Sequence, residues 1–259
     1  MSAAPRTLLI AAALLAACPG AARASAAEAA FRAGQWAAVT PAGRSEATAE
    51  ALALSARALL IRAAYQARSR EAALGLIAQA ERDVEAALAL APDSREALLQ
   101  RSAVIGYRAQ FTRSPAAGRK SRDLLRALTE RHGYWADGWL ALGVWHGESV
   151  ATVGPFLART ALGASADAMT RNFERAAMLD PQSPVVGAWR GLLALRLDAG
   201  AAPAARIALT QAAAKRPRDG YEALLRQHAI EVLDLLERGD TRAARARAEA
   251  LAGFAQLKG

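Results

Sequence analysis

Two stretches of the chain carry small and apolar residues at the same intervals. Steps of 5, 4, 3 and 5 residues lead from a glycine to a proline, first through Gly75, Ala80, Val84, Ala87 and Pro92 and then through Gly200, Ala205, Leu209, Ala212 and Pro217. Apolar residues at such intervals share one face of a helix, and a proline cannot continue the helix. The pattern therefore predicts one short amphipathic helix in each stretch.

Further stretches repeat parts of this pattern and add an earlier helix. The C-terminal segment has the same first three intervals, in Gly239, Ala244, Ala248 and Leu251. Large residues precede two of the units, in Trp189-x2-Leu192 and in Trp139-x2-Leu142-Gly143-x2-His146, the latter followed by Phe173-x2-Ala176-x4-Pro181. No run of β-branched residues is long enough to predict a strand, so we expect an all-α protein of paired helices.

This order of large and small residues resembles the tetratricopeptide repeat, a pair of antiparallel helices. The resemblance covers roughly residues 55–255. It implies an α-solenoid, because one helix pair cannot bury its apolar face and successive pairs share a core. We expect small residues such as Ala80, Ala205 and Ala244 to lie where paired helices come close, and Trp139 and Trp189 to fill the spaces between pairs.

One unit is longer than the repeat requires. The unit that opens at Trp139 takes 42 residues to reach its proline, against 28 for the unit that opens at Trp189. The extra residues fall within 147–163. They predict either a lengthened helix pair with a kink near Pro155, or an insertion that folds over a binding groove.

The residues before the repeats match the pattern weakly. Phe31-x2-Gly34-x-Trp36 resembles a worn repeat or a capping helix. We therefore expect an N-terminal capping segment at residues 25–50, followed by a repeat domain at 51–259.

The N-terminus has the features of a secretory signal over residues 1–24, with an end at 26 as a variant. Arg6 precedes an apolar run from Leu8 to Ala17, and Ala22-Arg23-Ala24 supplies the small residues of a cleavage site. Ten apolar residues would span only about half of a bilayer core, which disfavours a permanent membrane helix. The signal predicts a periplasmic or otherwise exported protein.

A second interpretation of the N-terminus involves lipidation. Leu15-Ala16-Ala17-Cys18 resembles the lipobox of bacterial lipoproteins, so Cys18 is a candidate lipidation site and would make the protein an outer-membrane lipoprotein. Contact with a membrane is expected only through such an anchor. Because Cys18 is the sole cysteine, an intramolecular disulfide is excluded.

The chain is basic, with a formal net charge of +9 and of +7 without residues 1–24. An exported protein rarely meets nucleic acid, so the expected anions are lipid head groups, acidic glycans or acidic proteins of the envelope. Basic residues concentrate in one stretch, comprising Arg101, Arg108, Arg113, Arg119, Lys120, Arg122, Arg126 and Arg131 against Asp123 and Glu130. Residues 114–118 predict a loop there. The stretch is either a solvated face and linker or an anion-binding patch extended by Tyr107 and Phe111.

Residues suited to catalysis are scarce. His146 and Glu148 form an H-x-E sequence like that of zinc deaminases, but no P-C-x-x-C follows and H-E-x-x-H is absent. His146 and His228 occupy places where the repeat expects large packing residues, and His132 lies in a turn with no visible partner. The sequence therefore predicts a non-enzymatic protein with no cofactor and no metal. A hydrolase or metal enzyme centred on His146 and Glu148 is the minor alternative.

The resemblance places the binding surface on the first helix of each pair. The groove residues carried over to this chain are Leu99, Tyr107, Leu140, Val144, Arg190, Ala194, Leu197, Arg226 and Leu233. Such a surface suits a partner segment with apolar groups and carboxylates, so we expect a scaffold or adaptor that binds a protein or peptide. Two alternatives stay open: these positions pack internally, or the protein is a carrier that holds a small or lipid-like ligand under residues 147–163.

Overall fold

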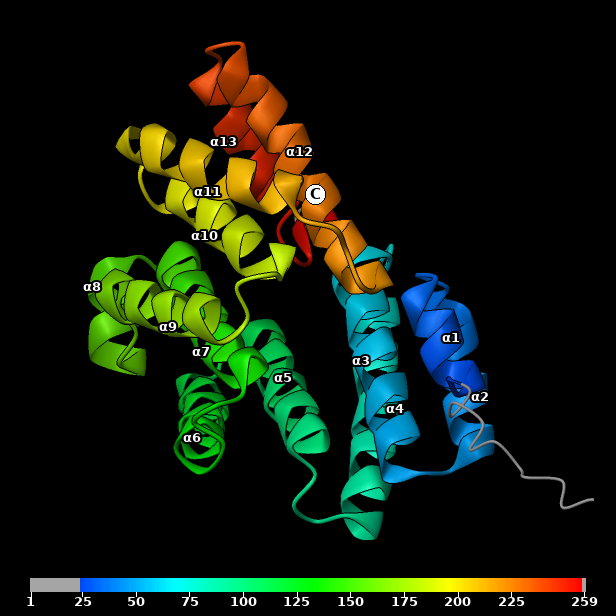
Figure 1. Cartoon of the computed structure of the whole chain (residues 1–259). Coiled ribbons are helices and arrows are strands. Elements are labelled where there is room, and N and C mark those ends of the chain that lie inside the picture. The colour runs from blue at the N-terminus through cyan, green and yellow to red at the C-terminus, as the bar shows by residue number, and fades with distance from the viewer. Residues whose placement is uncertain (1–23, 258–259) are drawn as a thin grey trace, which may run out of the picture.

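The computed structural model describes residues 24–257, and within them it contains thirteen α-helices and no β-strand (Figure 1). The predicted all-α class is confirmed, whereas Cys18 and the signal sequence before Ala24 lie outside the described residues. The helices are α1 (Ala26–Arg32), α2 (Trp36–Glu46), α3 (Ala49–Tyr65), α4 (Arg70–Leu90), α5 (Arg95–Thr112), α6 (Pro115–Arg131), α7 (Ala136–Val153), α8 (Pro155–Leu157), α9 (Ala166–Leu179), α10 (Pro184–Leu197), α11 (Ala202–Ala214), α12 (Gly220–Glu237) and α13 (Thr241–Ala250). Three short helical segments complete the chain: the π-helix η1 (Ala158–Leu162) and the 3-10 helices η2 (Ala199–Ala201) and η3 (Ala255–Leu257).

Side chains of the preceding residues fix where most helices begin. A serine, threonine or aspartate accepts a hydrogen bond from a backbone N–H of the first turn, which satisfies a donor that the helix itself leaves unpaired. These capping residues are Ser25, Thr48, Ser69, Ser94, Ser114, Ser165, Ser183, Asp219 and Asp240.

Two helix boundaries differ from the sequence-based expectation. The predicted loop at 114–118 is only a two-residue turn, because Ser114 caps α6 and Pro115 occupies its first position, where a missing N–H is tolerated. Helix α4 begins five residues before Gly75 rather than at it, because Ser69 caps the helix at Arg70. Gly75 is therefore an exposed position inside the helix.

Most helices pack in consecutive pairs: α3 with α4, α5 with α6, α7 with α9, α10 with α11, and α12 with α13. The first helices of neighbouring pairs are also in contact: α3 with α5, α7 with α10, and α10 with α12. The second helix of each pair contacts the first helix of the next. Ala80, Ala205 and Ala244 are fully buried, and Trp189 is 8% exposed.

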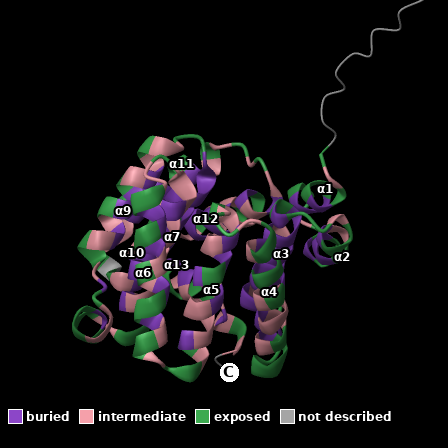
Figure 2. Ribbon diagram, turned by 90° about the horizontal axis from the view of Figure 1, so that it is seen from below, coloured by how far each residue is buried: buried purple, intermediate pink, exposed green. Residues whose placement is uncertain are grey.

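The core follows these helix contacts (Figure 2). The largest group of buried apolar residues has members in all five helices from α9 through α13. A second group lies between α3, α4 and α5, and a third lies between α1, α2 and α3. Among the described residues, no helix combines the length and the apolar character needed to cross a membrane.

The two ends of the array meet. The start of α12 contacts α1, and Tyr221 and Leu224 of α12 pack against the core residues Phe31 and Trp36 (Figure 1). The C-terminal segment returns to α3, where the Phe254 N–H donates to the Ala64 carbonyl oxygen at 2.7 Å. The Phe254 ring also lies edge-on to Tyr107 of α5, with the ring centroids 4.9 Å apart. Helices from the two ends of the described chain are therefore in contact.

The extra residues of the long unit pack against helices of two neighbouring pairs. Helix α7 ends at Val153, Gly154 adopts a φ of 80°, and α8 and η1 then turn back to contact α6 and α7. Two arginines of α6 hold this segment: Arg119 Nη1 donates to the Ala161 carbonyl at 2.7 Å, and Arg122 Nη1 donates to that of Leu162. The break at Gly154 agrees with the predicted kink beside Pro155.

Two glycine substitutions test the contact between the ends. A Cβ at position 220 would lie 2.4 Å from the Gly34 Cα and 2.6 Å from its nitrogen, so both backbones would have to move. We expect Gly220→Ala to lower the free energy of unfolding by about 1–3 kcal/mol. A Cβ at position 75 would have no neighbouring atom within 4 Å. Gly75→Ala should therefore raise the free energy of unfolding by about 0.5–1 kcal/mol. Urea denaturation measures both, and equal effects would contradict the described contact.

Candidate functional site

A polar cleft of about 270 Å³ opens where the N-terminal ends of α7, α10 and α12 approach α3. Its lining residues are Arg57, Trp135, Ala136, Asp137, Leu140, Asp180, Ser183, Val185, Arg218, Asp219, Tyr221 and Glu222. Helix N-termini carry partial positive charge, which favours the four carboxylates gathered there. A second, larger hollow of about 500 Å³ is lined by residues of α13 alone, so it encloses no site.

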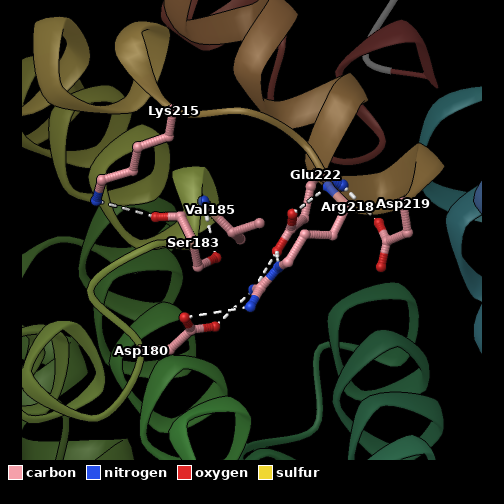
Figure 3. A network of polar contacts seen from close by, with 7 residues as sticks. All are labelled: Asp180, Ser183, Val185, Lys215, Arg218, Asp219 and Glu222. Carbon is pink, nitrogen blue, oxygen red and sulfur yellow. Dashed lines mark hydrogen bonds and ion pairs between the residues drawn. The ribbon is translucent and has the colours of Figure 1, made fainter.

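Arg218 fixes one wall of the cleft (Figure 3). Its Nη2 lies 2.6 Å from Asp180 Oδ2 at the end of α9, and its Nε donates to Glu222 Oε1 of α12 at 2.9 Å. Hydrogen bonds to Glu222 and to Asp180 raise the pKa of the guanidinium, so it stays charged. Asp219 accepts from the Glu222 N–H at 2.8 Å and caps α12. The turn between α11 and α12 is thus tied to α9.

Arg57 of α3 is held in the cleft by aromatic rings. Its guanidinium lies 5.0 Å from the ring centroid of Phe31 and 5.2 Å from that of Tyr221. The Tyr221 hydroxyl in turn accepts from Trp189 Nε1 at 3.3 Å. Ring faces attract a cation but do not satisfy its N–H donors. Among the described residues Arg57 has no ion pair or hydrogen bond, so its donors are available to a ligand in the cleft.

The cleft also contains an acid that has no hydrogen-bond donor among the described residues: Asp137, in the first turn of α7. Burial raises the pKa of its carboxyl; nearby Arg57 opposes this, whereas Asp180 and Asp219 add to it. Within the described part of the chain, this carboxylate accepts no hydrogen bond. A cation without an ion pair among the described residues and an acid whose pKa is raised by burial make this cleft a candidate binding site.

The predicted groove residues do not form one surface. Leu140 alone lines the cleft, while Val144, Ala194, Leu197 and Leu233 pack into the α9–α13 core. Tyr107 packs on Phe254, and Leu99 is half-buried. Arg226 Nε donates to the Ala213 carbonyl at the end of α11 at 2.8 Å, and Arg190 is exposed outside the cleft. The alternative of internal packing therefore holds for most of these positions.

No motif or spacing in the sequence indicates Arg57, Asp137 or Tyr221 as site residues. Phe31 and Tyr221, which hold Arg57, come from helices far away in the chain. Only the capping pattern of Asp219 and Glu222 was visible, and such a pattern predicts a helix start rather than a cleft.

The basic stretch is largely engaged in structural contacts. Arg108 pairs with Glu81, and Arg131 with Asp93, both at 2.6 Å. Arg126 and Arg122 lie within ion-pair distance of Glu130 and Asp123. Besides Arg119, which holds η1, the exposed members of the stretch include Arg101, Arg113 and Lys120. The solvated-face interpretation thus fits most of the stretch, whereas the part near η1 keeps free cations.

The histidines occupy packed positions. His146 is 7% exposed, and its Nδ1 accepts from the Ser165 N–H at 3.3 Å. Burial, and then Arg122, Arg171 and Arg126, lower its pKa to about 4. His228 is buried against Tyr65, and burial lowers its pKa as well. His132 ends α6 as its C-cap.

Glu148 is engaged with a buried arginine rather than with His146. Arg196 of α10, whose side chain is 3% exposed, binds both carboxylate oxygens of Glu148 on α7. Its Nε also donates to Glu249 Oε2 of α13 at 3.2 Å. Arg196 therefore links three helix pairs. In the part of the chain that the structure describes, no three His, Cys, Asp or Glu side chains form a group that could hold a metal.

Comparison with protein-family models, curated proteins and solved structures finds no match to this chain. Its function must therefore be inferred from the fold and the cleft.

Acid sensitivity tests the environment of His146. Its folded-state pKa of about 4 lies below the ordinary 6.5, so the unfolded chain takes up a proton first and stability falls as pH drops through this window. The expected loss between about pH 7 and about pH 5 is roughly 2 kcal/mol. The variant His146→Asn keeps an acceptor for the Ser165 N–H but does not titrate in this range. Its free energy of unfolding should therefore fall by about 2 kcal/mol less than that of wild type between the two pH values. Urea titrations at both pH values measure the difference, and parallel losses would be incompatible with the buried neutral imidazole.

A double-mutant cycle tests the Arg196 network. We expect Arg196→Met to cost about 2–4 kcal/mol of stability, because Glu148 is left half-buried without its partner. Glu148→Gln in the same chain should recover part of the loss, since the unpaired charge is then gone. Chemical denaturation of the single and double variants gives the coupling energy. Strictly additive effects would show that the two side chains do not interact.

Proposed function

We propose that this chain is an exported, non-enzymatic scaffold of the bacterial envelope, built as a tetratricopeptide-like solenoid, which binds a segment of a partner protein. The succession of helix pairs supports the solenoid assignment, because each pair contacts the next through its first and second helices. The repeated intervals ending at Pro92 and Pro217 support it independently. Export rests on the pattern of residues 1–24, and lipidation rests on Cys18.

The observation that carries the binding proposal is the stacked but otherwise unpaired Arg57. A guanidinium with free N–H donors binds a carboxylate through two parallel hydrogen bonds, and its aromatic neighbours keep it oriented. Trp135 and Leu140 supply apolar contact area around it. We therefore assign to Arg57 the carboxylate contact that the sequence had suggested for Arg190 and Arg226.

The size and charge of the cleft limit which kinds of partner segment can bind there. About 270 Å³ is slightly less than a pocket for a drug-sized ligand, so the cleft suits a chain end or a few side chains rather than a whole helix. Asp137 can accept an N–H of the same segment. The partner is thus expected to present a carboxylate beside an N–H donor and an apolar group.

The other hypotheses lack a comparable observation. Within and next to residues 147–163, Val150, Ala158 and Ala164 are buried and pack with Trp145, Leu162 and Leu197. This packing gives no support to a ligand held there. His146 and Glu148 have separate structural partners, so an enzyme centred on them is not favoured.

Selection from a random peptide library tests the proposal. We expect the full chain to enrich peptides with a carboxylate next to apolar residues, and Arg57→Gln to bind them about tenfold or more weakly, because a charged bidentate contact is lost. Arg190→Gln is the matched control, since Arg190 is exposed outside the cleft. Calorimetric titration of a selected peptide into each variant measures the affinities. Equal affinities for wild type and Arg57→Gln would reject the cleft as the binding site.

A further inference from the structure

A small apolar tip projects from the long unit. Val153, Phe156 and Leu157 lie at the end of α7 and in α8, and they are 40%, 76% and 54% exposed. Helix α8 lies at the edge of the molecule (Figure 1). Large apolar side chains gathered at a projecting point are unfavourable in water and indicate an interaction site.

The tip rests on a packed base. Ala158 and Ala164 are fully buried beneath it, and Val150 is 7% exposed. The two hydrogen bonds from Arg119 and Arg122 to the carbonyls of η1 fasten the segment to α6. Phe156 and Leu157 are therefore presented outward by an ordered turn, not by a loose loop.

Basic side chains lie beside this turn. Helix α6 and the segment from Val153 to Leu179 together hold eight basic and four acidic residues. Arg119, whose Nη1 binds the Ala161 carbonyl, and Arg159 within η1 are exposed. One of the acids, Asp123, is paired with Arg122 at 2.8 Å. Arg119 and Arg159 thus give the apolar tip a positive rim.

We propose that the tip inserts into the interface of an anionic lipid bilayer, a contact additional to the partner-binding cleft. Phe and Leu side chains gain free energy at the boundary between head groups and acyl chains. Each nearby lysine or arginine adds attraction to anionic head groups, and long basic side chains can reach phosphates while their stems stay apolar. This departs from the expectation that a membrane is met only through Cys18.

A lipid surface suits this feature better than a protein does. A stable protein interface buries roughly 800 Å² per partner, far more than three side chains expose. A bilayer needs no shape complementarity, and a positive rim complements anionic head groups directly. A second copy of this chain would bring an identical positive rim against the first, which is unfavourable.

Sedimentation with lipid vesicles tests the proposal on the full chain. Vesicles of neutral phosphatidylcholine are compared with vesicles that contain phosphatidylglycerol. The tip variant carries Phe156→Asp and Leu157→Asp, and the matched control carries Met178→Asp and Ile207→Asp, whose parent side chains are 66% and 62% exposed elsewhere. Residues 1–24 are identical in the wild type and in every variant. Any difference in vesicle binding between the tip variant and the control therefore results from the substitutions at the tip.

We expect wild type and the control to bind anionic vesicles more tightly than neutral ones, with binding weakened by salt. The tip variant should bind anionic vesicles about tenfold less, and Arg159→Glu should reduce the preference for anionic lipid. Circular dichroism checks that each variant is folded. Equal vesicle binding by wild type and the tip variant would overturn the proposal, as would a tip variant that changes only the oligomeric state.

Discussion

The contact between the two ends of the helix array is the constraint on which the rest of the structure depends. Gly220, the first residue of α12, lies so close to Gly34 that no side chain fits between the two backbones. This approach brings Tyr221 next to the Arg57 guanidinium, which also lies near the Phe31 ring. The cleft exists because helices from the beginning, middle and end of the chain meet there. Without the contact, Tyr221 would not lie next to Arg57, and the cleft would lack the wall that α12 forms.

Charged side chains inside the molecule follow two different rules. Arg196 and Arg218 are satisfied by carboxylates from neighbouring helices, and so is Asp83, which binds Arg44 and Ser55 between α2, α3 and α4. Such groups fix the positions of helices at a cost in desolvation. Arg57 has aromatic rings in place of carboxylates, and Asp137 has no donor among the described residues. That contrast distinguishes the cleft from the structural ion pairs.

The sequence predicted the all-α class and most of the helix pairs, because small residues such as Ala80, Ala205 and Ala244 recur at helical intervals. It did not predict the meeting of the ends, since a contact between two glycine backbones leaves no periodic signal. The site was also missed. The repeat register assigned Arg226 to a groove, whereas Arg226 donates to the Ala213 carbonyl of the preceding helix.

The long unit shows where reasoning from separate segments fails. The basic stretch and residues 147–163 were two independent features of the sequence, yet Arg119 and Arg122 of the first hold the carbonyls of the second. A residue pattern within one segment cannot indicate the partner of a long, flexible arginine. The apolar tip with its positive rim is a product of this contact.

The distance between the two ends in solution tests the central claim most directly. Spin labels on cysteines at the exposed positions Arg32 and Ala223, in a chain with Cys18→Ser, report the separation of α1 and α12 by double electron–electron resonance. If the ends meet, the label distances form a single short and narrow distribution, and Gly220→Leu broadens it. A long or broad distribution in the chain that retains Gly220 would contradict the closed arrangement, and with it the cleft around Arg57.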